Sequence, residues 1–342
     1  MRIKNHYVSQ GYLKRWSVDE KTVYAYRVLV SNENVPLWTR RSIDGIGYHR
    51  HLYTRIVAGK ESDELERVFG EEYESPAELA IRKAVSDQKL TPDDWRHMVR
   101  FLALQDIRTP ARLFQQLDRW GKDLPIWLDK LLLESVGELE SIVERGGRLP
   151  VSRPTDPTNR FPLRTTIEKA PNSDGGLLKA ELTVGRELWL FTVRNALENT
   201  ANVLHKHKWT VLKPPKGKKW ITSDNPVVRL NYYNEGKYDF GGGWDSEGSE
   251  ILFPLGPNHL LYTRVGHKPP LRGTRFPEYN GNLIRRFIAE HGHRMIFSKE
   301  PDDDIPRYKP RIVSADALKN ERSDWEKWHK EQTEAELASM ET

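Results

Sequence analysis

Three side chains near the start of the chain, His6, Gln10 and Arg15, have the chemistry of an acid–base and anion-binding site. They fall within NHYVSQGYLKRW, where a helix or a strand would place His6 and Gln10 on one side. Histidine exchanges protons near neutral pH, an amide can orient a substrate, and a guanidinium holds phosphate or carboxylate in a fixed fork. The alternative is that these groups bond to backbone and tie the first element into the core.

Carboxylates elsewhere in the chain could complete such a site. Glu66 and Glu74 are eight residues apart, about two turns along one helix face. Asp224 stands between Ser223 and Asn225 in WITSDNPVV, where a predicted strand runs into a polar turn. Paired carboxylates can act as acid and base or bind Mg²⁺ or Mn²⁺. The alternatives are a solvated helix face and an ordinary turn before proline.

Gln105, Arg108 and Arg112 occupy positions i, i+3 and i+7 of a predicted helix. This spacing places them on one face, and two guanidinium groups there would form an anion clamp. The alternative is a salt-bridged face that pairs with Glu66 or Glu74, and the two interpretations are compatible.

A basic turn contains Lys216, Lys218 and Lys219, with Trp209 and Trp220 on its arms. Cations mixed with aromatic rings are typical of a hairpin that binds nucleic acid. A lysine-rich solubilising loop is the alternative. The sequence HGH, at residues 291–293, is a weak metal signal because it has no clear third ligand.

The elements that must position these residues indicate an α+β protein. We expect a mainly helical N-terminal half packed with a mixed or antiparallel sheet formed by the N-terminal and C-terminal parts. Residues 40–55, RRSIDGIGYHRHLYTR, are expected to form a loop and strand beside the first element. The predicted helices span residues 62–85, 91–109, 111–120, 124–145, 186–204, 282–290 and 315–340. The predicted strands span residues 22–29, 208–212, 219–222, 227–232, 250–255, 259–265 and 294–298.

The chain divides by pattern into four stretches that we expect to form one composite unit. These are a polar motif with a helical bundle (1–145), a long loop or linker (146–176), a helix followed by strands (177–314) and a charged helix (315–342). The helix from residue 91 begins with Thr91 as N-cap and Pro92 in the first turn.

Composition excludes several classes of function. Without cysteine, neither a disulfide framework nor a thiolate zinc site can form. No signal peptide or membrane segment is visible, so we expect a cytoplasmic protein with no membrane partner. The chain lacks the Walker A, GxGxxG, HExxH and GxSxG motifs. A net charge of +5 over 342 residues only weakly favours nucleic acid or a nucleotide as partner.

Several blocks of the chain resemble a bacterial family known as domain of unknown function 4238. NHYVSQGYLKRW is similar to its HYVPQFYLRRF signature, and LERVFGEEYES, RFLALQDIRTPAR, WITSDNPVV and ILFPLGPNHLLYT are similar to later blocks in the same order. The chain departs from the signature at Ser9, Gly11, Lys14 and Trp16, which changes packing more than chemistry.

The resemblance supplies positions but no reaction. The matched polar positions are His6, Gln10, Arg15, Glu66, Glu74, Gln105, Arg108 and the turn at 223–225, and our hypothesis is that they gather in one pocket. We therefore expect a nuclease or another phosphoryl-processing hydrolase, with a toxin or phage-defence effector as one form. His6 would exchange protons, Arg15 and Arg108 would hold phosphate, and Asp224 with Glu66 or Glu74 would hold Mg²⁺ or Mn²⁺. The alternative is a non-catalytic nucleic-acid- or protein-binding module of a defence system.

Overall fold

The computed structural model describes residues 3–57, 59–148, 161–169 and 176–338 of the 342-residue chain. Helices and antiparallel sheets alternate irregularly along it, which confirms the predicted α+β class. No helix in these ranges is long and apolar enough to cross a bilayer.

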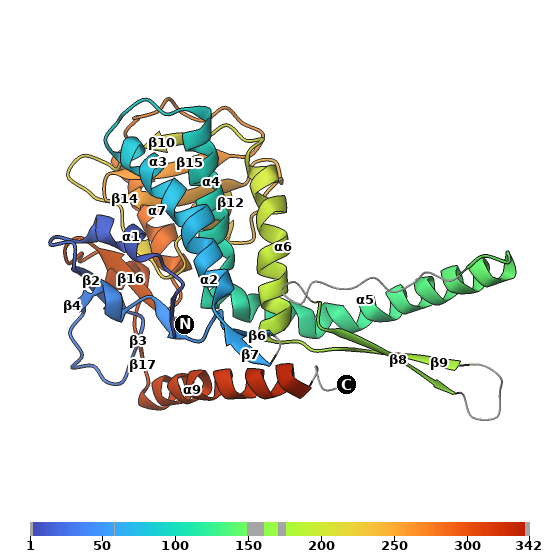
Figure 1. Cartoon of the computed structure of the whole chain (residues 1–342). Helices are drawn as coiled ribbons and strands as arrows, with labels where there is room; N and C mark the ends of the chain where they lie inside the picture. The colour runs from blue at the N-terminus through green and yellow to red at the C-terminus, as the bar shows by residue number, and fades with distance from the viewer. Residues whose placement is uncertain (1–2, 58, 149–160, 170–175, 339–342) are drawn as a thin grey trace.

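A five-stranded antiparallel sheet forms the upper part of the molecule in Figure 1. In spatial order it contains β10 (Thr210–Leu212), β15 (His259–Arg264), β14 (Glu250–Gly256), β12 (Val228–Asn234) and β13 (Lys237–Asp239). Four of these strands, β10, β15, β14 and β12, overlap predicted strands, whereas β13 was not predicted. Nearly every residue of β10, β14 and β15 is buried, so these are apolar runs bounded by turn residues.

A four-stranded antiparallel sheet joins the two ends of the sequence, as predicted. Its spatial order is β11 (Thr222–Ser223), β16 (Met295–Ser298), β2 (Thr22–Arg27) and β4 (Trp38–Ser42). The pairing of β2 with β16 brings residues 22–27 beside residues 295–298. Helix α7 (Glu278–His291) precedes β16 and contacts β11 and β12.

The helices of the N-terminal half pack beside the five-stranded sheet (Figure 1). They are α2 (Glu64–Val68), a π-helical turn (Phe69–Glu74), α3 (Ser75–Val85) and α4 (Pro92–Ile107), followed later by α6 (Arg186–Leu204). Thr91 caps α4 in a complete capping box with Asp94, which confirms the predicted start. Pro76 does not end the helix, because residues 64–85 are helical without a break, and the π-helical turn lies just before the proline.

Two predicted boundaries are wrong. Helix α5 (Pro110–Glu144) is one helix where two were expected, with Pro125 inside it. The proline removes one hydrogen bond, but Leu124 and Leu128 continue a single apolar row. Part of the predicted linker is a hairpin of β8 (Leu163–Lys169) and β9 (Gly176–Leu182) that extends with α5 away from the body (Figure 1). The predicted linker residues 149–160 and 170–175 lie outside the described residues.

Helix α9 (Ala315–Ala338) lies along the base of the molecule (Figure 1). It contacts β3 (Leu29–Val30), β6 (Arg55–Val57) and α6. A buried ion pair anchors it, because Arg186 at the start of α6 donates from Nε to Glu336 at 2.7 Å. The smaller elements are β7 (Lys60–Ser62), which pairs with β6; β17 (Ile312–Val313), which pairs with β3; and α8 (Ile305–Tyr308).

Candidate functional site

The N-terminal motif forms strand β1 (Lys4–His6) and the short helix α1 (Gln10–Leu13). Strand β1 pairs with β5 (Tyr48–Arg50), which confirms the predicted strand beside the first element. In this pair Asn5 lies opposite His49, and the backbone N–H of Tyr7 donates to the Gly47 carbonyl at 2.9 Å. The motif therefore fixes the position of the β5 strand.

A buried polar network holds the backbone just after β1. Gln105 Nε2 and Arg108 Nε both donate to the Tyr7 carbonyl, at 3.0 and 3.1 Å, and Gln105 Oε1 accepts from the Ser9 N–H at 3.2 Å. Arg108 Nη1 also donates to Glu74 Oε1 at 2.6 Å, and the Ser9 hydroxyl donates to the other Glu74 oxygen at 3.0 Å. The Arg108 side chain is fully buried and its donors are directed at protein acceptors. The pair of Arg108 with Glu74 is the salt bridge that the alternative interpretation of this helix face expected, and Gln105 and Arg108 also hold the backbone after β1.

A polar cavity of about 660 Å³ lies on the outer side of the motif. Four predicted residues line it together, namely His6, Gln10, Glu66 and Glu74. The Gln10 amide donates to His6 Nε2 at 3.1 Å, and burial lowers the pKa of His6, so the ring is neutral at pH 7. Arg15 does not line this cavity; its guanidinium is paired with Glu78.

The turn at 223–225 has its own surroundings next to the start of β16. Asp224 accepts three backbone N–H bonds at 2.8–3.0 Å, from residues 293 to 295. Burial raises its pKa to about 6 although these three donors favour the charged form. Ser223 pairs with Ile296 in the sheet, and the Asn225 amide donates to the His291 carbonyl at 3.3 Å. These bonds give the Asp224 carboxylate a structural role in the turn. That all the predicted site residues share one pocket stays a prediction.

The remaining predicted anion-binding residues are largely paired. Arg112 donates from Nε to Asp106 at 3.0 Å rather than to Glu66 or Glu74. In the basic turn, Lys218 pairs with Asp304 at 3.0 Å and Lys219 with Glu300 at 2.8 Å, while Lys216 is exposed. The ion pairs partly neutralise the turn, as expected for a solubilising loop.

A cavity of about 800 Å³ on another side of the described chain was not predicted. Its floor is one face of the four-stranded sheet, where strand register gathers the side chains. Arg41 lies opposite Val23 of β2. Arg27 is four residues after Val23 on the same strand and lies opposite Met295. These positions share a face because side chains alternate along a strand. Arg322 reaches the same cavity from α9.

This basic cavity carries more positive than negative charge. Five arginines and two glutamates line it: Arg27, Arg41, Arg50, Arg294, Arg322, Glu321 and Glu326. Within the described ranges, no carboxylate lies at ion-pair distance from Arg27, Arg41 or Arg322, whereas Arg294 pairs with Glu321 at 2.7 Å. Burial, followed by the charges of Arg41 and Arg322, lowers the pKa of Arg27. Arginine side chains clustered in this way produce a positive electrostatic potential that attracts anions.

A clamped imidazole lines the inner wall of the basic cavity. The His49 ring stacks on Trp325 of α9 at 3.8 Å between centroids and on Tyr7 at 5.3 Å. Burial, with a smaller effect of His293, lowers the pKa of His49 to about 4, so it is neutral at pH 7. No hydrogen-bond partner of its ring nitrogens lies in the part of the chain that the structure describes. The cluster of histidine and arginine in residues 40–55 was the available sequence signal.

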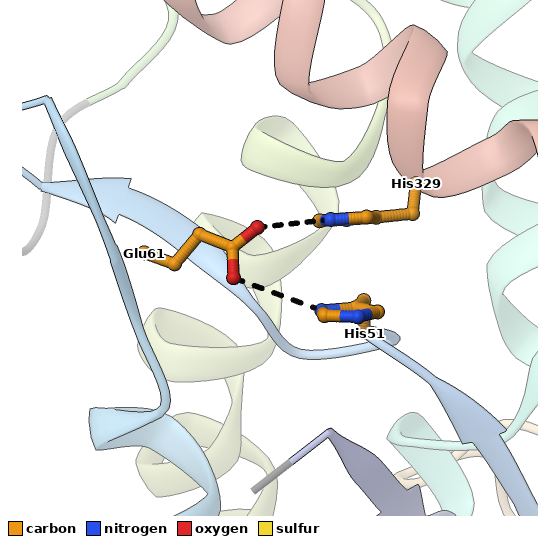
Figure 2. Close-up of side chains that lie close together, drawn as sticks. All are labelled: His51, Glu61 and His329. Carbon is orange, nitrogen blue, oxygen red and sulfur yellow. Dashed lines mark ion pairs between the residues drawn. The ribbon is translucent and has the colours of Figure 1, made fainter. Parts of the chain in front are cut away.

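One group of three side chains among the described residues has ligand atoms within 4.8 Å of one another, and Figure 2 shows it. Glu61 lies 2.9 Å from His329 Nε2 and 4.0 Å from His51 Nδ1, and the two rings stack at 3.8 Å. Glu66, Glu74 and Asp224 form no such group in these ranges. A shared Mg²⁺ or Mn²⁺ at those three carboxylates therefore stays a prediction.

The contacts of His329 argue against a metal at the group in Figure 2. Arg186 Nη1 donates to His329 Nδ1 at 2.9 Å, because a guanidinium has no acceptor. The neutral ring then carries its proton on Nε2, the atom that faces Glu61. A metal-bound histidine instead donates its second ring N–H to an acceptor. The group therefore fits a contact that docks α9 better than a metal centre.

Comparisons with known proteins identify the family and nothing more specific. Searches against curated proteins and against solved structures give no significant match. A family model described as "Protein of unknown function (DUF4238)" matches residues 4–302, most of the chain. The match confirms the resemblance noted in the sequence. The chain belongs to the DUF4238 family.

Proposed function

We propose that the protein is a phosphoryl-processing hydrolase, a class that includes nucleases, and that its reaction takes place in the basic cavity. One observation carries the proposal: Arg27, Arg41 and Arg322 line the basic cavity without a carboxylate partner among the described residues. Guanidinium groups bind phosphate oxygens in a bidentate fork, and a phosphate would relieve the repulsion among them.

His49 supplies the group that the reaction needs. Its neutral imidazole takes a proton from a water molecule, whose oxygen attacks phosphorus as the bond from phosphorus to the leaving oxygen breaks. The leaving oxygen is then protonated, by His49 or by solvent. The arginines stabilise the charge that develops on the phosphoryl oxygens. A bound phosphate would also raise the pKa of His49 toward neutrality, because it is a nearby negative charge.

The N-terminal motif has an indirect role in this proposal. Gln105 and Arg108 hold the Tyr7 carbonyl, β1 pairs with β5, and β5 carries His49. The Tyr7 ring then stacks on the imidazole. These residues are positioning residues, and their loss should misplace His49 without removing it.

The test is hydrolysis of bis(p-nitrophenyl) phosphate and of labelled RNA and DNA, with Mg²⁺, Mn²⁺ or EDTA in parallel. We expect His49→Gln to lower turnover by about 10²–10⁴-fold, the usual contribution of a general base. His267→Gln is the matched control, because His267 is an exposed histidine outside the cavity. His6→Ala and Asp224→Ala, once shown to be folded, compare the predicted site with the basic cavity.

Two results would decide against the proposal. Turnover that survives His49→Gln but is lost in folded His6→Ala would place the chemistry in the N-terminal cavity. Anion binding without turnover of any substrate, with or without metal, would favour the non-catalytic nucleic-acid-binding module.

A further inference from the structure

Resting on the proposed function, we infer that the substrate is a single-stranded nucleic acid several nucleotides long, bound across the basic cavity and a second cavity beside it. The second cavity has a volume of about 440 Å³. Arg294 lines both cavities, so they meet at this residue.

The second cavity has its own cation and aromatic rings. Lys309 lines it and makes no ion pair with any described carboxylate, since its ammonium donates to the Glu290 carbonyl at 2.7 Å. Phe240 and His291 line the cavity with ring centroids 5.1 Å apart. Burial lowers the pKa of His291 to about 4, so its ring is an uncharged stacking surface at pH 7.

A row of rings connects the two cavities. Trp325, stacked on His49 in the first, lies 5.5 Å from Phe114, which lies 6.0 Å from His293 in the second. Phe114 is 42% exposed although it is a large apolar side chain. The row His49, Trp325, Phe114 and His293 thus runs from one cavity to the other, with His49 between Trp325 and Tyr7 and with Phe114 as its exposed ring.

Aromatic rings interleaved with cations match the chemistry of a single strand. Bases stack on the rings with little preference for sequence, and phosphates bind the cations. A duplex is excluded from this mode because its bases are already stacked and paired inside the helix. A mononucleotide bound in the basic cavity would leave Phe114 and Lys309 unused, so these two residues report on a longer substrate.

The experiment measures the binding of fluorescent RNA and DNA oligonucleotides of one, two, four and eight nucleotides, and of a duplex, by anisotropy in EDTA. We expect affinity to rise with length up to a few nucleotides and the duplex to bind more weakly. Phe114→Ser should weaken tetranucleotide binding about 5- to 150-fold, the range for one lost stacking partner. Lys309→Gln should reduce the slope of log affinity against log salt by about one. Inorganic phosphate binding, measured by calorimetry, should not change in either variant.

Phe161→Ser is the matched control, because Phe161 is similarly exposed and packs on Phe191, and neither residue lines either cavity. Equal affinity for a mononucleotide and an octanucleotide, unchanged in Phe114→Ser and Lys309→Gln, would overturn the inference and leave the proposed function standing. Length-dependent binding that is lost in both variants, without hydrolysis of any substrate, would support the inference and remove the proposed function.

Discussion

Replacing Arg27 by glutamine should change stability in opposite directions with and without a bound anion. In the empty protein Arg27 is half-buried, and burial, Arg41 and Arg322 all lower its pKa. Its charge is therefore unfavourable in the fold, although solvent screens much of the repulsion. Removing it should raise the free energy of unfolding by about 0.5–1 kcal/mol, the size of one partly exposed charge contact.

With phosphate present, the wild type should instead be more stable than Arg27→Gln. At a concentration 100-fold above the dissociation constant, phosphate stabilises the wild type by about 2.7 kcal/mol. Loss of charge-assisted bonds from Arg27 would weaken binding about 10- to 100-fold, which reduces that stabilisation to about 0.4–1.4 kcal/mol. The wild type would then be more stable than Arg27→Gln by up to about 2 kcal/mol.

Urea unfolding of both proteins, with and without phosphate at fixed ionic strength, measures this change in the sign of the stability difference. Arg40→Gln is the matched control. Arg40 is next to Arg41 in β4, but it pairs with Asp19 at 2.6 Å. It should lose a little stability in both conditions and keep the response to phosphate. If Arg27→Gln were instead destabilised equally in both conditions, Arg27 would have a structural role and the anion site would be refuted.

Three further predictions concern Asp224, Arg108 and His49. The raised pKa of Asp224, about 6 against 3.8, means that its ionisation costs the fold about 3 kcal/mol as pH rises from about 4 to 7. In urea titrations, the difference in unfolding free energy between wild type and Asp224→Asn should therefore change by about that amount over this range, and a constant difference would contradict the assignment. Arg108→Met leaves Glu74 without its buried partner and should cost about 3–5 kcal/mol by the same method; a loss below about 1 kcal/mol would mean that the network does not anchor the motif. In NMR titrations the pKa of His49, about 4 when the cavity is empty, should rise on addition of phosphate, and activity should fall as pH drops through the raised value, because the base must be neutral. An unchanged pKa would show that phosphate does not bind close to the His49 ring.

Local patterns predicted much of the fold. Thr91 and Pro92 mark the start of α4 because capping depends only on neighbouring residues. Most strands of the C-terminal half follow from short apolar runs and turn residues, although β13 was not predicted. Helix α5 was predicted as two helices, 111–120 and 124–145, but the apolar row through Leu124 and Leu128 keeps it continuous.

The site was harder to predict because non-local pairing creates it. Arg27 and Arg41 share a face only through the register of β2 with β4, and Arg322 joins them only because α9 docks through Arg186. No local pattern carries that information. The N-terminal motif stood out for its polar density, but the side chains that hold its Tyr7 backbone, Gln105 and Arg108, come from another part of the chain.

Helix α9 begins at Ala315, after the family match ends at residue 302. The matched residues of this chain include the sheet floor of the basic cavity, with Arg27, Arg41 and His49, but not the wall that carries Arg322 and Trp325. The wall is one continuous helix, but it packs Trp325 on His49 and Trp328 against the hydrophobic core. Substitutions confined to α9 would therefore change both the charge of the basic cavity and the surroundings of His49, without altering the strands that carry Arg27 and Arg41.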